Sequence, residues 1–170
     1  MLRYFLATLF VVLSNFALAA GTIVDSAFVT DAARRGVLVW DVRGAQDYAK
    51  GHLPGAVNIG DVAQVLRDPN TEDFLPTDRI EKILGAAGID PAREIVVYAG
   101  RGAWHAYLGR FAIQHFGGTR VYVYHGGIDD WRAAGNAVST EVVKLAPVAL
   151  KLKVDDSVAV STAQMIARLK

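Results

Sequence analysis

Short apolar runs alternate with segments of helical periodicity along residues 22–140, which predicts an α/β domain. Three runs have the unbroken apolar character of strands that are buried on both faces; they lie at 37–41, 94–98 and 120–124. Apolar positions at i, i+3, i+4 and i+7 predict helices, which cover 77–87, 104–115 and the turns around Ile128 and Trp131. Strand–helix order with short connections implies a parallel sheet flanked by helices on both faces.

The last thirty residues have a different pattern. Residues 141–154 predict an extended linker, and Ser161 to Gln164 form a capping box that opens a new helix with Met165, Ile166 and Leu169 on it. A helix that begins this close to Lys170 indicates the start of a second domain, so 141–170 is interpreted as linker plus truncated second domain. The alternative is a terminal helix that docks back on the first domain.

The first nineteen residues predict a secretory signal peptide. Arg3 is the positive n-region, a ten-residue apolar stretch follows, and Ala17-Leu18-Ala19 is a small-x-small cleavage site. We therefore expect export to the periplasm or the medium, with no membrane association after cleavage. The alternative is an uncleaved anchor, because the apolar stretch up to Val24 is long enough to span a bilayer.

Composition narrows the classes of function. The 170 residues carry 18 Lys plus Arg against 17 Asp plus Glu, which gives no electrostatic reason to expect nucleic acid as a partner. The sequence contains no cysteine, which excludes disulfides, thiolate zinc sites and any thiol nucleophile. His105, His115 and His125 recur every ten residues, a spacing that fits no metal site, and no metal or cofactor is expected.

The segment from Ala99 to Trp104 is the most informative part of the chain. It joins a predicted strand to a predicted helix and contains two glycines, so its backbone N–H groups can curl inward beside the helix N-terminus and hold an anion. The candidate anion-binding residues are Ala99, Gly100, Arg101, Gly102, Ala103 and Trp104. The glycine spacing does not fit a dinucleotide fingerprint, and no Gly-Lys-Ser/Thr ending marks a Walker loop.

A second set of residues is assigned a structural role. Asp41 and Arg43 close the first predicted strand and are expected to tie the segment Gly51–Ala56 to the sheet, with Asp47 as a partner of Arg43. His52 is expected to anchor a turn through hydrogen bonds rather than act as an acid or base. Gly126, Gly127 and Trp131 follow the third strand. Trp40, Trp104 and Trp131 are interpreted as core or half-buried packing residues, or Trp104 as a lid over the 99–104 loop.

These motifs together resemble the rhodanese domain. The resemblance rests on Asp41-Val42-Arg43, Gly51-His52-Leu53-Pro54-Gly55-Ala56, the strand and loop at 97–104, and GGxxxW at 126–131, in this order. It extends from about Ile23 to Ser139. The segment 73–76 and the tail 160–163 are similar to the amino-terminal half, and the start of the second half, of tandem sulfurtransferases. On this resemblance the fold is rhodanese-like.

The resemblance places the family's nucleophilic cysteine on Ala99, its loop glycine on Gly102 and a frequent Arg or Thr on Trp104. In active members the thiolate takes the outer sulfur of thiosulfate, releases sulfite and passes the sulfur from a persulfide to cyanide or a thiol. An alanine methyl cannot do this, so we expect no catalytic residue in this domain. The resemblance implies a second rhodanese domain of the same parent chain as partner.

Three interpretations of the missing cysteine stay open at this stage. The domain is the non-catalytic first half of an exported tandem thiosulfate sulfurtransferase, with a structural or regulatory role. Alternatively, it is a self-sufficient inactive module that binds a small sulfur oxyanion or a protein. The third is an engineered replacement of cysteine by Ala99 in an active single-domain enzyme. A dinucleotide-binding domain is disfavoured by the glycine spacing.

Overall fold

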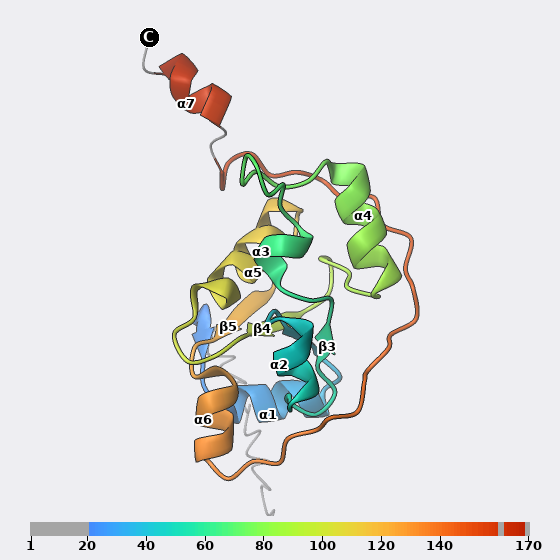
Figure 1. Ribbon diagram of the computed structural model, residues 1–170, viewed down its shortest axis with the longest axis vertical. Helices are drawn as coiled ribbons and strands as arrows, with labels where there is room; N and C mark the ends of the chain where they lie inside the picture. The colour runs from blue at the N-terminus through green and yellow to red at the C-terminus, as the bar shows by residue number, and fades with distance from the viewer. Residues whose placement is uncertain (1–20, 160–161, 169–170) are drawn as a thin grey trace, which may run out of the picture.

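A five-stranded parallel sheet forms the centre of the molecule in the computed structural model, which describes residues 21–159 and 162–168 (Figure 1). The strands are β1 Ile23–Val24, β2 Leu38–Asp41, β3 Val57–Asn58, β4 Ile95–Tyr98 and β5 Val121–Tyr124. The helices are α1 Ser26–Arg34, α2 Ala45–Ala49, α3 Val62–Val65, α4 Thr77–Ala86, α5 Trp104–His115, α6 Gly127–Ala133 and α7 Thr162–Arg168. The spatial strand order is β1-β5-β4-β2-β3, so β4 lies at the middle of the sheet.

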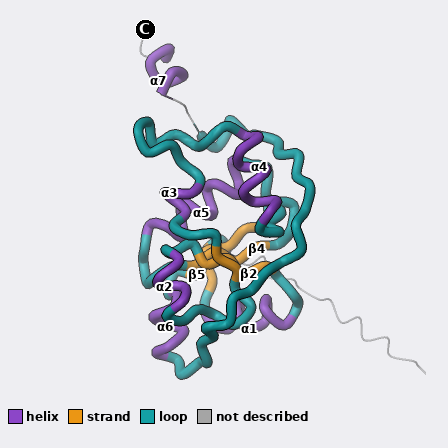
Figure 2. The backbone as a smooth tube through the Cα atoms, turned by 45° about the vertical axis from the view of Figure 1, so that its right-hand side comes forward, coloured by secondary structure: helices purple, strands orange, loops and turns teal. Residues whose placement is uncertain are grey.

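Helices cover both faces of the sheet, as Figures 1 and 2 show: α1 and α6 pack on one face, and α3, α4 and α5 on the other. Because side chains alternate along a strand, each apolar run feeds two cores. Val97 belongs to the core under α5, whereas Val96 and Tyr98 belong to the core over α1 and α6. The predicted three-layer α/β class is therefore confirmed.

Helix α5 packs closely on the central strands because it carries Gly109. A Cβ at that position would lie 2.8 Å from Val97 Cγ1 and 2.9 Å from Val42 Cγ1. At Gly109 the helix backbone therefore packs directly on the side chains of the sheet, with no side chain of its own in between. This close packing positions the α5 N-terminus, and the loop before it, directly over the end of β4.

The three predicted strands and three of the predicted helices are confirmed to within one or two residues. The sequence pattern gave no prediction for β1, β3, α1, α2 or α3. Four of these elements span two to five residues, too few to establish a period. Helix α1 is longer, and its N-cap is a signal in the sequence: the Asp25 side chain accepts a hydrogen bond from the Phe28 N–H at 2.9 Å.

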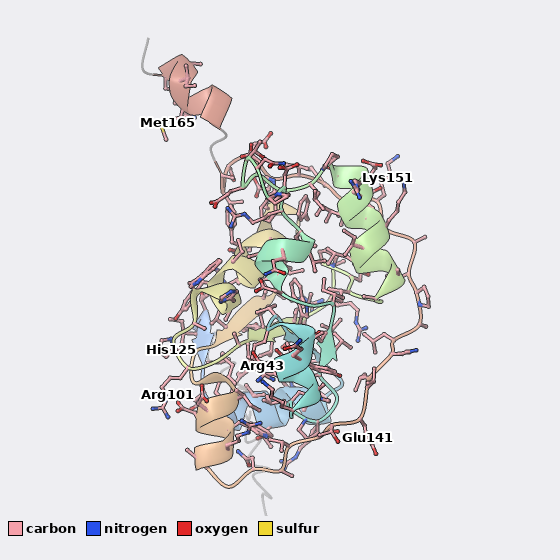
Figure 3. All side chains as sticks on the ribbon, in the orientation of Figure 1. Arg43, Arg101, His125, Glu141, Lys151 and Met165 are labelled. Atoms are coloured by element: carbon pink, nitrogen blue, oxygen red, sulfur yellow. The ribbon has the colours of Figure 1, made fainter. Side chains whose placement is uncertain are left out.

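Residues 139–159, called the strap below, run over the domain without helix or strand (Figure 2). The absence of regular structure agrees with the predicted linker, but the strap is bound to the domain along its length. The Val148 N–H donates to Gly85 O at 2.9 Å, and the Leu152 N–H donates to Glu81 Oε1 at 2.8 Å. In Figure 3, Glu141 lies near the end that holds α6 and Lys151 lies beside α4.

Helix α7 follows the strap and stands apart from the rest of the domain (Figure 1). The sequence predicted a helix here, and this part is confirmed; Met165 and Ile166 are 50% and 53% exposed. Ser161, Leu169 and the predicted signal peptide lie outside the described residues. Among the helices that are described, none has the length and apolar character needed to cross a bilayer. A second domain remains a prediction.

Candidate functional site

The buried carboxylate of Asp41 organises the carboxyl end of β2. Arg43 binds it with Nε at 2.9 Å from Oδ1 and Nη2 at 2.6 Å from Oδ2, and the Tyr98 hydroxyl donates to Oδ2 at 2.7 Å. Arg43 Nη2 also donates to Gly51 O at 2.9 Å. The expected tie between the strand end and the segment that follows α2 is therefore present.

The Asp41 network also determines how two of its members ionise. Burial raises the pKa of the Tyr98 hydroxyl far above its ordinary value, and the adjacent negative charge of Asp41 raises it further. For the Arg43 guanidinium, burial is the largest influence and lowers the pKa. Hydrogen bonds and the charge of Asp41 outweigh it, so the pKa of Arg43 is raised. Both groups keep their protons, which suits a structural role.

Asp47 does not pair with Arg43, so that expectation was wrong. Its Oδ1 lies 2.9 Å from Lys50 Nζ on the surface of α2, and this hydrogen bond is the main reason why the pKa of Asp47 is lowered. Two causes account for the difference. Residues three apart on a helix face each other, and Arg43 is already held by Asp41.

His52 is fully buried and anchors the turn, as predicted. Its Nδ1 lies 2.9 Å from Tyr48 O, and its ring stacks on the Tyr48 ring at 3.7 Å between centroids. The sequence did not indicate its second partner, the carbonyl oxygen of Glu141 in the strap, 3.0 Å from Nε2. The main chain of His52 also pairs with that of Ser139. With both ring nitrogens engaged, His52 fixes the start of the strap.

Ala99 lies at the carboxyl end of β4 and is 1% exposed. The start of α6 closes over it: the Ile128 N–H donates to Ala99 O at 3.0 Å. Gly127 has a φ of +55°, and a Cβ there would collide with Ala99 O. The GGxxxW motif therefore permits a close approach between α6 and the 99–104 loop. Trp131, from the same motif, packs in the core below and donates to Ala137 O at 2.8 Å.

Three N–H groups of the 99–104 loop already have acceptors within the protein. The Arg101 N–H donates to Asp129 Oδ2 at 2.7 Å, and the Gly102 N–H donates to His125 O at 2.9 Å. The Ala103 N–H donates to Gly100 O at 3.1 Å. Gly102, with a φ of +67°, allows the loop to curl in this way. A carboxylate from α6 thus occupies one of the donors that the sequence analysis assigned to an external anion.

The charge of Arg101 is also matched inside the domain. Its guanidinium forms an ion pair with Asp130, the residue after Asp129. Figure 3 shows Arg101 and His125 on the same side of the domain, near α6. Two adjacent carboxylates on α6 thus contact this loop, one through the main chain and one through the side chain. Sequence reasoning missed both, although Asp129 and Asp130 fall inside the GGxxxW motif.

Trp104 is 55% exposed, which fits the half-buried packing expected of it and excludes a position in the core. Its ring lies over His105 at 4.0 Å between centroids and lines a cleft between α5, the segment 67–77 and the end of the strap. Trp40 and Trp131 are buried, as expected. Trp104 differs because it is the first residue of α5 and lines this cleft.

The three regularly spaced histidines have unrelated surroundings. His105 Nε2 lies 3.6 Å from Asp61 Oδ2, His115 stacks on Phe74 at 5.3 Å, and His125 Nδ1 lies 2.7 Å from the Tyr107 hydroxyl. Within the described parts of the chain, no group of three or more potential ligands of the His, Cys, Asp or Glu type gathers in one place.

Comparison with known proteins relates this chain to the rhodanese-like domain family. The model of the rhodanese-like domain matches residues 28–134. A thiosulfate sulfurtransferase from Corynebacterium glutamicum is 37% identical over 86 residues, which cover 51% of this chain and 28% of the relative. A thiosulfate sulfurtransferase from Azotobacter vinelandii is 31% identical over 121 residues, covering 68% of this chain and 44% of the relative. The chain thus matches less than half the length of each.

A solved structure shares the fold. The crystal structure of SseA from Escherichia coli, described as a 3-mercaptopyruvate sulfotransferase with the rhodanese fold, superposes with a TM-score of 0.77 at 18% identity. The superposition covers 87% of this chain and 61% of SseA. Residues 28–134 make up a smaller share of the chain than the 87% that superposes on SseA. The structural likeness therefore extends beyond the residues that the family model matches.

Proposed function

This chain belongs to the rhodanese-like domain family, and on that premise we propose that it is a non-catalytic domain of a sulfurtransferase whose nucleophilic cysteine lies on another domain. The observation that carries the proposal is Ala99. It is buried at the carboxyl end of the central strand β4, where the resemblance places the nucleophile. A methyl group forms no persulfide, and the sequence offers no other thiol.

The proposed parent reaction is sulfane sulfur transfer from thiosulfate to cyanide or a thiol. A cysteine thiolate attacks the outer sulfur of thiosulfate, the sulfur–sulfur bond breaks, and sulfite leaves with the electron pair. Cyanide or a thiolate then attacks the outer sulfur of the persulfide and regenerates the cysteine thiolate. The names of the Corynebacterium and Azotobacter relatives support this substrate class.

The proposed partner is a second rhodanese domain in the same parent chain. One observation supports it: the matched part of the chain covers only 28% and 44% of the two relatives described above. Within this arrangement the first domain has a structural role, and the strap leads from it toward the partner. The leader at 1–19 supports export to the periplasm or the medium.

The stand-alone module that binds a sulfur oxyanion has weaker support. Asp129 accepts the Arg101 N–H, and Asp130 pairs with Nη2 of the Arg101 guanidinium, so the main-chain donor is occupied and the side-chain charge is compensated. A dianion such as thiosulfate would also meet the negative charge of Asp129 at the loop. The loop is therefore better suited to holding α6 in place than to binding a free anion.

Peptide mapping of the natural polypeptide, isolated from its source, tests the proposal. We expect an amino terminus at Ala20 and peptides beyond Lys170 that include a second rhodanese-like segment with a cysteine at a strand end. Its thiosulfate–cyanide activity should disappear when that cysteine is replaced by alanine. A natural polypeptide that contains no cysteine would overturn the proposal, and an intact Met1 terminus would overturn the proposed export.

A further inference from the structure

A cleft of about 710 Å³ lies between α5, the segment 67–77 and the end of the strap. Its volume falls within the range of small-molecule binding sites. It has no part in the proposed sulfurtransferase role and shares only Trp104 with the 99–104 loop. The inference drawn from it goes beyond that role and does not depend on it.

Aromatic rings form one wall of the cleft. Phe74 stacks on Phe111 at 5.6 Å and on His115 at 5.3 Å, measured between ring centroids. Trp104 lines the same cleft with its ring more than half exposed. Aromatic faces of this kind bind apolar groups, and the negative potential above their rings also attracts organic cations, most strongly for Trp.

The charges that line the cleft favour a cation. Its one arginine, Arg67, is bound to Glu72: Nη2 lies 2.9 Å from Glu72 Oε2, and Nε donates to Glu72 O at 2.6 Å. The carboxylates of Asp73 and Asp156 also line the cleft and have no hydrogen bond or ion pair with any described residue. The positive charge is thus compensated, and two negative charges are left over.

Hydrogen bonds hold the part of the strap that lines the cleft. The Asp155 N–H donates to His115 O at 2.7 Å, and Asp155 Oδ1 accepts the Ser157 N–H at 2.9 Å. The first bond attaches the segment that carries Asp156 to the end of α5, and the second forms a turn within the strap. A ligand therefore meets a preformed site, which lowers the entropic cost of ordering it.

We propose that this cleft binds a small arylalkylammonium ion. Its aromatic body packs against Phe74 and Trp104, and its ammonium group is directed toward Asp73 and Asp156. The aromatic wall provides most of the binding, because exposed ion pairs alone contribute little. The carboxylates and the Trp104 ring provide the discrimination in favour of positive charge.

Calorimetric titration of the full chain with three matched probes tests this proposal. The probes are 2-phenylethylammonium, the neutral 2-phenylethanol and the anionic 3-phenylpropionate. We expect saturable binding of the cation, binding of the alcohol that is weaker by about fivefold, and no saturable binding of the anion. Tryptophan fluorescence provides a second readout, because Trp40 and Trp131 are buried and only Trp104 is exposed.

Variants of the cleft separate the contribution of charge to ligand binding from that of aromatic packing. The double variant Asp73→Asn with Asp156→Asn should weaken binding of the cation by about fivefold and leave the affinity for the alcohol unchanged. Trp104→Leu should weaken both ligands, with an unchanged melting temperature as the control for folding. Equal affinity for all three probes, or no saturation with the cation, would overturn the proposal. Neither result would affect the proposed sulfurtransferase role.

Discussion

The carboxylate of Asp129 accepts the main-chain N–H of Arg101 at 2.7 Å, so a residue of α6 occupies a donor of the 99–104 loop. A Cβ on Gly100 would lie 3.3 Å from the same carboxylate, which shows how closely it packs against the loop. The loop and α6 are further joined by the Ile128 N–H and Ala99 O. The loop that lacks the family's cysteine is thus in contact with a carboxylate of the domain itself, that of Asp129.

Restoring the cysteine alone is not expected to restore sulfur transfer. In the Ala99→Cys variant the thiolate would share the loop with the Asp129 carboxylate, which raises the thiol pKa and repels thiosulfate. We predict thiocyanate formation at the level of the enzyme-free blank. Adding Asp129→Ala frees the Arg101 N–H and should increase the rate by about tenfold or more.

The control for this pair is Ala99→Cys with Asp78→Ala, which removes an exposed carboxylate that pairs with Lys82 on α4. This double variant should form thiocyanate no faster than Ala99→Cys alone. Equal rates for Ala99→Cys with and without Asp129→Ala would show that Asp129 does not obstruct the site.

His52→Ala should destabilise the domain by about 2–4 kcal/mol. The substitution removes the stacking on Tyr48 and the two ring nitrogens that lie within hydrogen-bond distance of the carbonyl oxygens of Tyr48 and Glu141. Chemical denaturation measures the change in the free energy of unfolding. His105→Ala is the matched control and should change it by about 0.5 kcal/mol or less. A His52→Ala variant as stable as this control would contradict the anchoring role.

Gly85→Ala tests whether the strap is bound to the domain. Alanine normally stabilises a helix relative to glycine by up to about 1 kcal/mol. At this position, however, its Cβ would lie 2.5 Å from Val148 O. We therefore predict a net loss of about 1–3 kcal/mol, with faster hydrogen exchange at the Val148 N–H. Gly44→Ala is the control, because a Cβ added there would have no atom within 4 Å. Unchanged exchange at Val148 would indicate that the strap is not held there.

Tyr98 should make the stability of the domain fall at alkaline pH. Because burial raises the pKa of its hydroxyl in the folded chain, only the unfolded chain ionises once the pH passes about 10. The stabilisation is complete below that pH and is lost as the pH rises further. Tyr98→Phe should cost about 1–3 kcal/mol at neutral pH and flatten the decline above pH 10. Denaturation from pH 7 to pH 11 checks both, and an equally steep decline in the variant would contradict the assignment.

The central strands could be predicted from the sequence because they are buried on both faces, which leaves unbroken apolar runs such as Ile95–Tyr98. The link from Arg43 to the turn at Gly51 followed from an acid and a base two residues apart at a strand end, and the structure contains it. Strands β1 and β3 could not be predicted, since two residues show no periodicity. Their pairing depends on neighbours that are distant in the sequence, Val123 and Trp40 among them.

The partners within the site were harder to predict. Asp129 contacts a loop 28 residues earlier in the chain, and only the close packing of Gly127 against Ala99 brings the two together. Likewise, the contact between His52 and the strap joins positions 89 residues apart. Trp104 lines a cleft whose other walls come from residues 67–77 and the strap, which the local pattern does not show.

The most direct test of the non-catalytic assignment compares this chain with the natural polypeptide in a thiosulfate–cyanide assay, with intact mass measured after incubation with thiosulfate. We predict that this chain gains no sulfur atom and forms no thiocyanate above the enzyme-free blank. The natural polypeptide should form thiocyanate through a persulfide on a cysteine outside these residues. Thiocyanate formed by this chain alone would contradict the assignment.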